Sequence, residues 1–204
     1  MIPKTNFNES QTKINLMRAF AGECQARQRY YQGALAAQKQ FLVGLERMFR
    51  FTAEQEEQHA KIYFELLKDA AGEEIEINAG FPADVYTDMQ QLLDAAAKAE
   101  EKENGIIYPD FERIARDEGF QQAAAKFKMI GAIENSHRER FAYYAGLWRD
   151  GMMFRSDSSE ERWMCLNCGH IHTGSEPPTE CPVCGVQQGY FIREAEAPFT
   201  FTGM

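Results

Sequence analysis

The sequence predicts a mainly α-helical fold: a four-helix bundle with one long crossover connection, followed by a small β-rich metal module. Four long segments carry apolar residues at intervals near 3.6, as amphipathic helices do. Two of these segments contain a Glu-x-x-His pair, whose members share one helix face. The C-terminal part contains two Cys-x-x-Cys pairs, which predict a separate metal site.

The composition excludes several classes of protein. A chain of 204 residues has room for one medium domain and a small module. Its net charge of -9 argues against non-specific binding to nucleic acid or anionic membranes, because both require basic surfaces. No apolar run approaches the roughly 18 residues that span a bilayer, and the N-terminus MIPKTNFNESQTK is too polar for a secretory signal. We therefore expect a cytoplasmic protein.

The first predicted helix covers residues 11–38, with Ser10 as its N-cap. Glu23 lies inside it among small residues that would let a facing helix approach. Tyr30 follows seven positions later, on nearly the same face. Cys24 is expected to be a small buried residue. A lone glutamate in a helix usually faces solvent. Glu23 is therefore a candidate ligand only in combination with the acidic and histidine residues of the other segments.

The second predicted helix covers residues 41–70 and carries Glu56 and His59 near its middle. Taken alone, this charge-rich stretch is typical of an exposed acidic face. Residues 71–83 contain glycine, proline and the alternating sequence EIEIN, which predict a short strand or an extended connection. A long crossover between the second and third helices is used by ferritin-like folds.

The third predicted helix covers residues 85–104 and offers two carboxylates three positions apart, Glu100 and Glu103. Its continuation is expected to bend or restart at Pro109.

The fourth predicted helix covers residues 120–148 and carries Glu134 and His137 at its middle. The polar segment 151–160 that follows is a plausible linker. We therefore expect a bundle domain over residues 1–150 and a metal domain with a C-terminal tail over residues 161–204.

The last domain contains four cysteines in two paired turns, and each turn is followed by a glycine that lets backbone amides point at the sulfurs. An odd total of five cysteines with this pairing indicates a metal site in a reducing compartment, not a disulfide framework. Four thiolates suit tetrahedral zinc or a single iron, and spacing alone favours a zinc ribbon slightly. The predicted ligands are Cys165, Cys168, Cys181 and Cys184.

Together the four helices provide one carboxylate or more each, with a histidine one turn away on two of them. That coincidence predicts a dinuclear site, because carboxylates and imidazoles suit iron or manganese and bridging carboxylates hold two cations close together. The candidate ligands are Glu23, Glu56, His59, Glu100, Glu103, Glu134 and His137.

This combination resembles the rubrerythrin family, in which a ferritin-like di-iron bundle is fused to a rubredoxin-like Fe(Cys)4 module. The resemblance covers almost the whole chain and implies iron in both sites. It rests on AFAGECQARQRYY, TAEQEEQHAK, the Glu100-x-x-Glu103 pair followed by YPDF, Glu134-x-x-His137, and a cysteine module with a twelve-residue loop and CPVCG.

The resemblance also implies roles for the bundle ligands. Glu56 and Glu134 would bridge the two irons. Glu23 would be a terminal ligand of the first iron, and Glu100 and His137 would be terminal ligands of the second.

In the family, a carboxylate and a histidine exchange on the first iron as its redox state changes, which would be the role of Glu103 and His59. Tyr30 and Tyr108 match tyrosines that hydrogen-bond near the site, although a core aromatic with a satisfied hydroxyl is the alternative for both.

The implied activity is reduction of hydrogen peroxide to water by a homodimer, as a defence against oxidative stress. Electrons would enter at the Fe(Cys)4 site from a rubredoxin or an NAD(P)H-dependent flavoprotein reductase and pass to the di-iron site. In the family, one subunit's cysteine site lies close to its partner's di-iron site.

Two other functions fit parts of the sequence. A ferroxidase or iron-storage protein of the ferritin kind would explain the bundle but not the cysteines. A non-catalytic scaffold with a structural zinc ribbon would explain the cysteines but would not explain the seven candidate ligands of the bundle.

Overall fold

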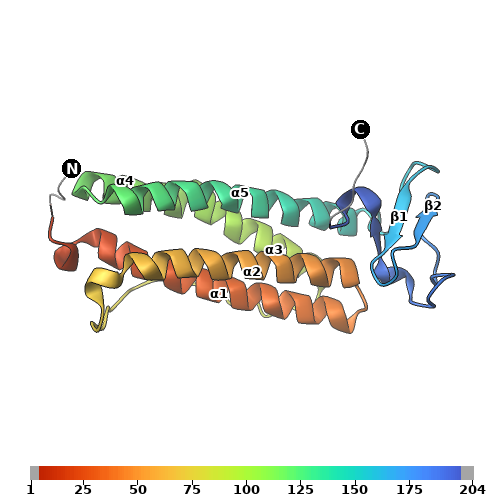
Figure 1. The fold of residues 1–204 in the computed structure, drawn as a ribbon, viewed down its shortest axis with the longest axis horizontal. Helices are drawn as coiled ribbons and strands as arrows, with labels where there is room; N and C mark the ends of the chain where they lie inside the picture. The colour runs from red at the N-terminus through yellow and green to blue at the C-terminus, as the bar shows by residue number, and fades with distance from the viewer. Residues whose placement is uncertain (1–4, 199–204) are drawn as a thin grey trace.

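A computed structural model describes residues 5–198 of the chain, so the last part of the predicted tail, residues 199–204, lies outside it. Long helices form an elongated bundle, and the small β module lies at one end of it (Figure 1). The helices are α1 (Gln11–Lys39), α2 (Val43–Leu66), α3 (Met89–Lys102), α4 (Tyr108–Glu118) and α5 (Gln121–Arg149). The mainly α fold with a C-terminal β-rich module confirms the predicted class.

The helix ends follow local capping chemistry. The Ser10 side chain accepts a hydrogen bond from the Lys13 amide, as an N-cap does. The predicted start of the third helix near residue 85 is wrong, because the Asp88 side chain caps α3 by accepting from the Gln91 amide. The second helix also ends earlier than predicted, at Leu66.

The crossover between α2 and α3 forms no strand; it is an extended segment fastened to α1 by side chains. Arg18 Nε donates to the Asn78 carbonyl at 3.1 Å, and Gln25 Nε2 donates to the Pro82 carbonyl at 2.7 Å. These bonds satisfy carbonyls that an extended chain would otherwise leave to solvent.

A π-helical turn, Glu103–Ile107, joins α3 to α4. The predicted bend or restart at Pro109 is found as a restart: α4 begins at Tyr108, and the proline lies in its first turn, where its missing amide hydrogen costs no helical hydrogen bond. The irregularity precedes the proline, and such wide turns are frequent at functional sites.

Two apolar clusters fill the bundle, one toward each end. Phe49, Phe141 and Leu93 lie in the cluster nearer the β module, and Leu16 and Phe127 lie in the other. Between these clusters, α1, α2, α3 and α5 each contain a buried glutamate, and α2 and α5 also contain a buried histidine. The bundle therefore holds a polar layer between two dry cores.

The β module is a three-stranded antiparallel sheet in the order β2-β1-β3. Its strands are β1 (Arg162–Cys165), β2 (Ile171–Thr173) and β3 (Phe191–Arg193). The module packs on the α1–α2 turn: Arg47 Nη2 donates to the Leu166 carbonyl at 3.2 Å, and a Cβ on Gly189 would overlap the Phe41 carbonyl oxygen. Within residues 5–198, no helix is both long and apolar enough to cross a membrane.

Candidate metal centres

The polar layer of the bundle brings six of the seven predicted ligands together in two overlapping sets. In each set, one donor atom per residue lies within 4.8 Å of the others. Two carboxylates, Glu56 and Glu134, belong to both sets, so they lie between the two positions. The first set is Glu23, Glu56, His59 and Glu134; the second is Glu56, Glu100, Glu134 and His137.

The two imidazoles face the shared carboxylates from opposite sides. His59 Nδ1 lies 3.1 Å from Glu56 Oε2 and 3.1 Å from Glu134 Oε1. His137 Nδ1 lies 2.8 Å from the other oxygen of each, Glu56 Oε1 and Glu134 Oε2. The rings are stacked with their centroids 5.7 Å apart. Each shared carboxylate therefore directs one oxygen to each position.

Several of these buried atoms have no hydrogen-bond partner among the described residues. They are Glu23 Oε2, Glu56 Oε1, Glu100 Oε2, both oxygens of Glu134 and His137 Nδ1. Buried polar atoms are normally paired, because an unpaired one costs about 1–3 kcal/mol. Atoms that converge on one another without bonding fit a site for cations, and the oxygen and nitrogen donors suit iron.

Two buried tyrosines bind carboxylates of the site from outside, as predicted. The Tyr30 hydroxyl donates to Glu100 Oε1, and the Tyr108 hydroxyl donates to Glu23 Oε1. Burial raises the pKa of both tyrosines well above their usual value, so both hydroxyls keep their protons. Each tyrosine fixes one oxygen of a glutamate and leaves the other oxygen directed at the site.

A second support holds His137, and sequence reasoning missed it. Arg140 Nη1 donates to Gln55 Oε1 at 3.0 Å, which identifies that atom as the amide oxygen because arginine only donates. His137 Nε2 lies 3.1 Å from the same oxygen and must therefore be the donor. The Nδ1 lone pair is then free for a cation, the arrangement typical of metal-binding histidines.

Burial and mutual repulsion shift the pKa values of the metal-free site. Burial, and then the Glu134 charge, raise the pKa of Glu23 well above its usual value; burial and the Glu56 charge do the same to Glu100. Burial alone would lower the pKa of His59, but the surrounding carboxylates raise it to about 12. Burial opposes ionisation of Glu56, yet its neighbouring imidazoles lower its pKa to about 2. Protons thus supply the positive charge that cations would supply.

The seventh predicted ligand, Glu103, lies outside both sets, on the π-turn. It is partly exposed. Burial, followed by repulsion from Glu134 and Glu56, raises its pKa to about 8. In this structure His59 is inside the first set and Glu103 is beside it.

The four cysteines of the β module also come together. Cys165 Sγ lies 3.8 Å from Cys184 Sγ, and Cys168 Sγ lies 3.7 Å from Cys181 Sγ. A tetrahedral ion with metal–sulfur bonds of about 2.3 Å requires sulfur–sulfur separations of about 3.8 Å. The glycines after the two turns, Gly169 and Gly185, have φ of 78° and 73°, as their predicted role requires. The module therefore fits one tetrahedral metal.

Two further findings concern residues outside the donor sets. Cys24 is exposed, so the expectation of a buried cysteine is wrong; it lies beside Glu23 but on the outer face of α1. Tyr63, which the sequence analysis did not select, is fully buried one turn after His59, and its ring lies 5.8 Å from that of Tyr108.

The chain matches two family models. Residues 15–144 match the model described as "Rubrerythrin", and residues 163–192 match the one described as "Rubrerythrin, rubredoxin-like domain". The first match includes every bundle ligand, and the second includes all four cysteines of the module.

Named relatives agree with this match along most of the chain. Rubrerythrin of Clostridium perfringens is 42% identical over 183 residues, covering 89% of this chain and 93% of the relative. Rubrerythrin of Nitratidesulfovibrio vulgaris is 38% identical and covers the same shares.

Among solved structures, nigerythrin in a mixed-valence state has a TM-score of 0.60 and 26% identity, covering 95% of this chain and 94% of that one. Bacterioferritin of Desulfovibrio desulfuricans has a TM-score of 0.63 at 18% identity, covering 70% and 82%, which shows the ferritin-like fold alone. With its di-iron ferritin-like bundle and its rubredoxin-like four-cysteine site, the chain belongs to the rubrerythrin family.

Proposed function

We propose that this chain is a non-haem iron peroxidase that reduces hydrogen peroxide to water. Reduction of one peroxide breaks its O–O bond and consumes two electrons and two protons. The observation that carries the proposal is the sharing of Glu56 and Glu134 between two adjacent donor sets, since a pair of irons there would supply both electrons at one place. The four-cysteine site gives electrons an entry point, which an iron-storage function would not need.

The ligand roles follow from the donor sets and remain part of the proposal. Glu56 and Glu134 would bridge the irons, with Glu23 terminal on the first and Glu100 and His137 terminal on the second.

His59 and Glu103 would be alternative ligands of the first iron. Tyr30 and Tyr108 would hold the terminal carboxylates in place. Cys165, Cys168, Cys181 and Cys184 would hold the third iron.

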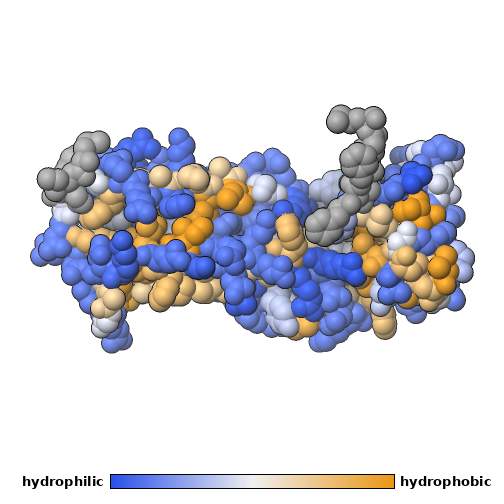
Figure 2. Space-filling model, in the orientation of Figure 1, coloured by the Kyte–Doolittle hydropathy of each residue, from blue (hydrophilic) through white to orange (hydrophobic). Residues whose placement is uncertain are grey.

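The electron route is proposed to run between subunits of a homodimer. Glu56 lies 13 residues along α2 from Val43, about 20 Å from the end on which the β module packs. That is a long path within one chain, and a second copy would shorten it. Figure 2 shows hydrophobic residues gathered on the face where α2 and α5 lie, and both helices carry exposed apolar side chains, among them Phe64 and Met129.

The donor is proposed to be a rubredoxin or an NAD(P)H-dependent flavoprotein reductase, and the compartment to be the cytoplasm, where thiolates stay reduced. We assign residues 1–150 to the di-iron domain, residues 151–160 to a linker and residues 161–204 to the Fe(Cys)4 domain. The spans of the two family matches support this division.

The test is an anaerobic absorption trace of the fully reduced, iron-loaded protein after addition of one equivalent of hydrogen peroxide. We expect rapid return of the visible bands of oxidised thiolate-bound iron. Glu56→Ala should slow that return strongly while leaving the four-cysteine iron in place.

Equal rates in the variant and the parent protein would refute peroxide reduction at the bundle site. Absence of the bands from protein purified with its native metals would indicate zinc in the module and refute the electron route.

A further inference from the structure

A cavity of about 500 Å³ adjoins the first donor set, between α1 and the segment formed by α3, the π-turn and α4. Glu103 and Tyr108 form part of its wall. Hydrogen peroxide, little larger than a water molecule of about 30 Å³, would fill a small part of it. Cavities of this size commonly hold organic ligands. Most of the remaining wall is apolar and includes Ala19, Gly22, Phe81, Ile106, Ile107 and Phe111.

The crossover holds this cavity in shape. The hydrogen bonds of Asn78 and Pro82 to α1 fasten it on both sides of Phe81. A Cβ on Gly22 would lie 3.8 Å from Phe81 Cε1, so any side chain longer than alanine at that position would enter the space beneath the ring. The absence of a side chain at Gly22 therefore leaves room next to Glu23.

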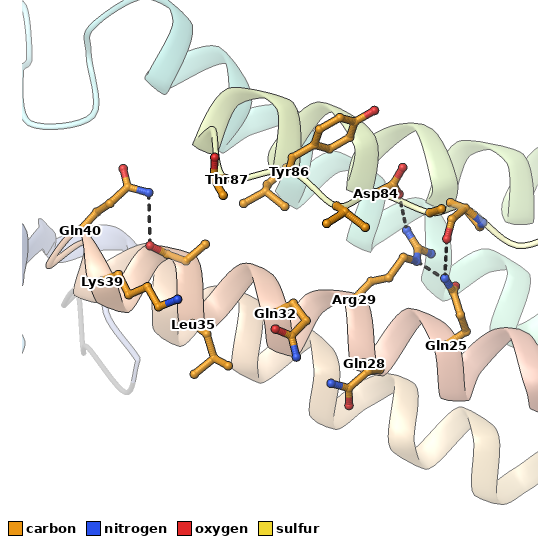
Figure 3. A pocket seen from close by; sticks show the side chains of 15 residues that line it. Gln25, Gln28, Arg29, Gln32, Leu35, Lys39, Gln40, Asp84, Tyr86 and Thr87 are labelled. Atoms are coloured by element: carbon orange, nitrogen blue, oxygen red, sulfur yellow. Dashed lines mark hydrogen bonds and ion pairs between the residues drawn. The ribbon is translucent and has the colours of Figure 1, made fainter.

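A neighbouring groove has a similar volume, about 580 Å³, so volume alone does not identify a ligand-binding site. Figure 3 shows its side chains on α1 and the crossover: Gln28, Gln32 and Lys39 are polar, and Arg29 pairs with Asp84 at 3.1 Å. None of the seven bundle ligands lines that groove. The cavity beneath Phe81 differs because Glu103 and Tyr108 line it, and the Tyr108 hydroxyl donates to Glu23 of the first donor set.

We infer that this cavity binds the hydrocarbon part of organic hydroperoxides, with the peroxide group directed toward Glu103 and Tyr108. This inference rests on the proposed peroxidase function and names a second substrate class for it. The reaction cleaves the O–O bond of ROOH and yields ROH and water. It consumes two protons from solvent at the cavity mouth and two electrons from the reduced protein, which a rubredoxin-type or flavoprotein donor restores.

The test compares cumene hydroperoxide with hydrogen peroxide in single-turnover re-oxidation of the reduced, iron-loaded protein. The quantity of interest is the ratio of the two second-order rate constants. Phe81→Ala and Ile106→Ala should lower this ratio about fivefold or more, since both remove apolar surface at the exposed mouth. Val85→Ala should leave the ratio unchanged, because Val85 is exposed on the same crossover but lines the groove of Figure 3.

Binding of the unreactive alcohol 2-phenyl-2-propanol, measured by calorimetry, examines the cavity without turnover. We expect weaker binding to Phe81→Ala than to Val85→Ala. If hydrogen peroxide is reduced but the ratio and the alcohol affinity are the same in all variants, the inference is wrong and the proposed function stands. If neither peroxide is reduced, the proposed function fails, and the inferred activity fails with it even if the alcohol binds.

Discussion

The two metal centres of this chain are built in opposite ways. The bundle site draws its ligands from residues 23 to 137, on four helices, and its six grouped ligands are buried. The four-cysteine site draws its ligands from residues 165 to 184, on two short turns, and Cys168 is exposed. The bundle site therefore depends on a completed fold, whereas the module site depends on local chain geometry.

The difference extends to what stabilises each region without metal. The bundle has two large apolar clusters. Their packing can offset the cost of burying several carboxylic acids when no metal cation is bound. Among the described residues, the apolar cluster of the module contains four buried residues, two of which, Cys165 and Cys181, are predicted metal ligands. We infer that the bundle folds without metal and that the module needs its metal to fold.

The largest expected effect comes from removing a shared carboxylate. Glu134→Gln should abolish iron binding in the bundle and slow peroxide-dependent re-oxidation by about 100-fold or more, because one change damages both donor sets. Iron analysis and the single-turnover trace measure both effects. The four-cysteine iron should remain, and the metal-free variant should melt no earlier than the metal-free parent, since one buried acid is gone.

Loss of folded structure in Glu134→Gln would contradict the view that the bundle folds around its apolar clusters. Glu139→Gln is the matched control, because Glu139 is exposed on the same helix.

The second effect is confined to the module. Cys181→Ser should remove the visible thiolate–iron bands and the hydrogen-exchange protection of β1 to β3, while the amides of α1 to α5 keep theirs. Cys24→Ser should change neither, because Cys24 is exposed and far along the chain from the module. Loss of protection in the bundle after Cys181→Ser would show that the two regions fold as one unit.

The same contrast explains how much could be predicted from sequence. All four cysteine ligands lie within a stretch of twenty residues, so their spacing alone predicted a metal site. The helical period predicted which glutamates and histidines share a face and hence the pool of candidate ligands, whereas the sharing of Glu56 and Glu134 between two metals was implied by the family resemblance. Glu103 was also a predicted ligand, but the helical period could not show that a π-turn places it outside the two donor sets.

What sequence could not predict depends on contacts between helices. Gln55 directly precedes Glu56, and Arg140 follows His137 by three positions, so both lay next to selected residues. Nothing in one sequence shows that residues 85 positions apart share a hydrogen bond. The start of α3 lies later than predicted for a different reason: the Asp88 side chain caps the helix, and the apolar period alone does not mark that cap.

A smaller effect is expected from the support of His137. Gln55→Leu should weaken iron binding at the second position by about 10- to 100-fold, because Nε2 loses the acceptor that fixes the ring. Arg140 would also lose a partner. Iron titration of the metal-free protein measures this, and Gln58→Leu, on the exposed side of α2, is the control. Equal iron affinity in both variants would mean that packing alone orients His137.

The smallest effect is a pH dependence that separates the metal-free bundle from the loaded one. The pKa of Glu103 is raised from 4.5 to about 8, so the folded protein holds a proton that the unfolded chain releases between these values. The raised pKa values of Glu23 and Glu100 act in the same direction, and so does His59, whose stabilisation is complete below 6.5 and is lost as pH rises toward 12. The lowered pKa of Glu56 acts oppositely, but only below 4.5.

The raised pKa values predict that the metal-free protein loses stability as pH rises from 5 to 8, by about 5 °C in Tm after allowance for partial exposure of Glu103. Glu103→Gln should flatten that slope, whereas Glu101→Gln, at an exposed position near the end of α3, should not. The iron-loaded protein should show the reverse trend, because iron replaces the same protons and binds more tightly as they leave. Calorimetric scans at three pH values distinguish the cases, and a metal-free Tm that rises with pH would show that the acids of the bundle are not held protonated.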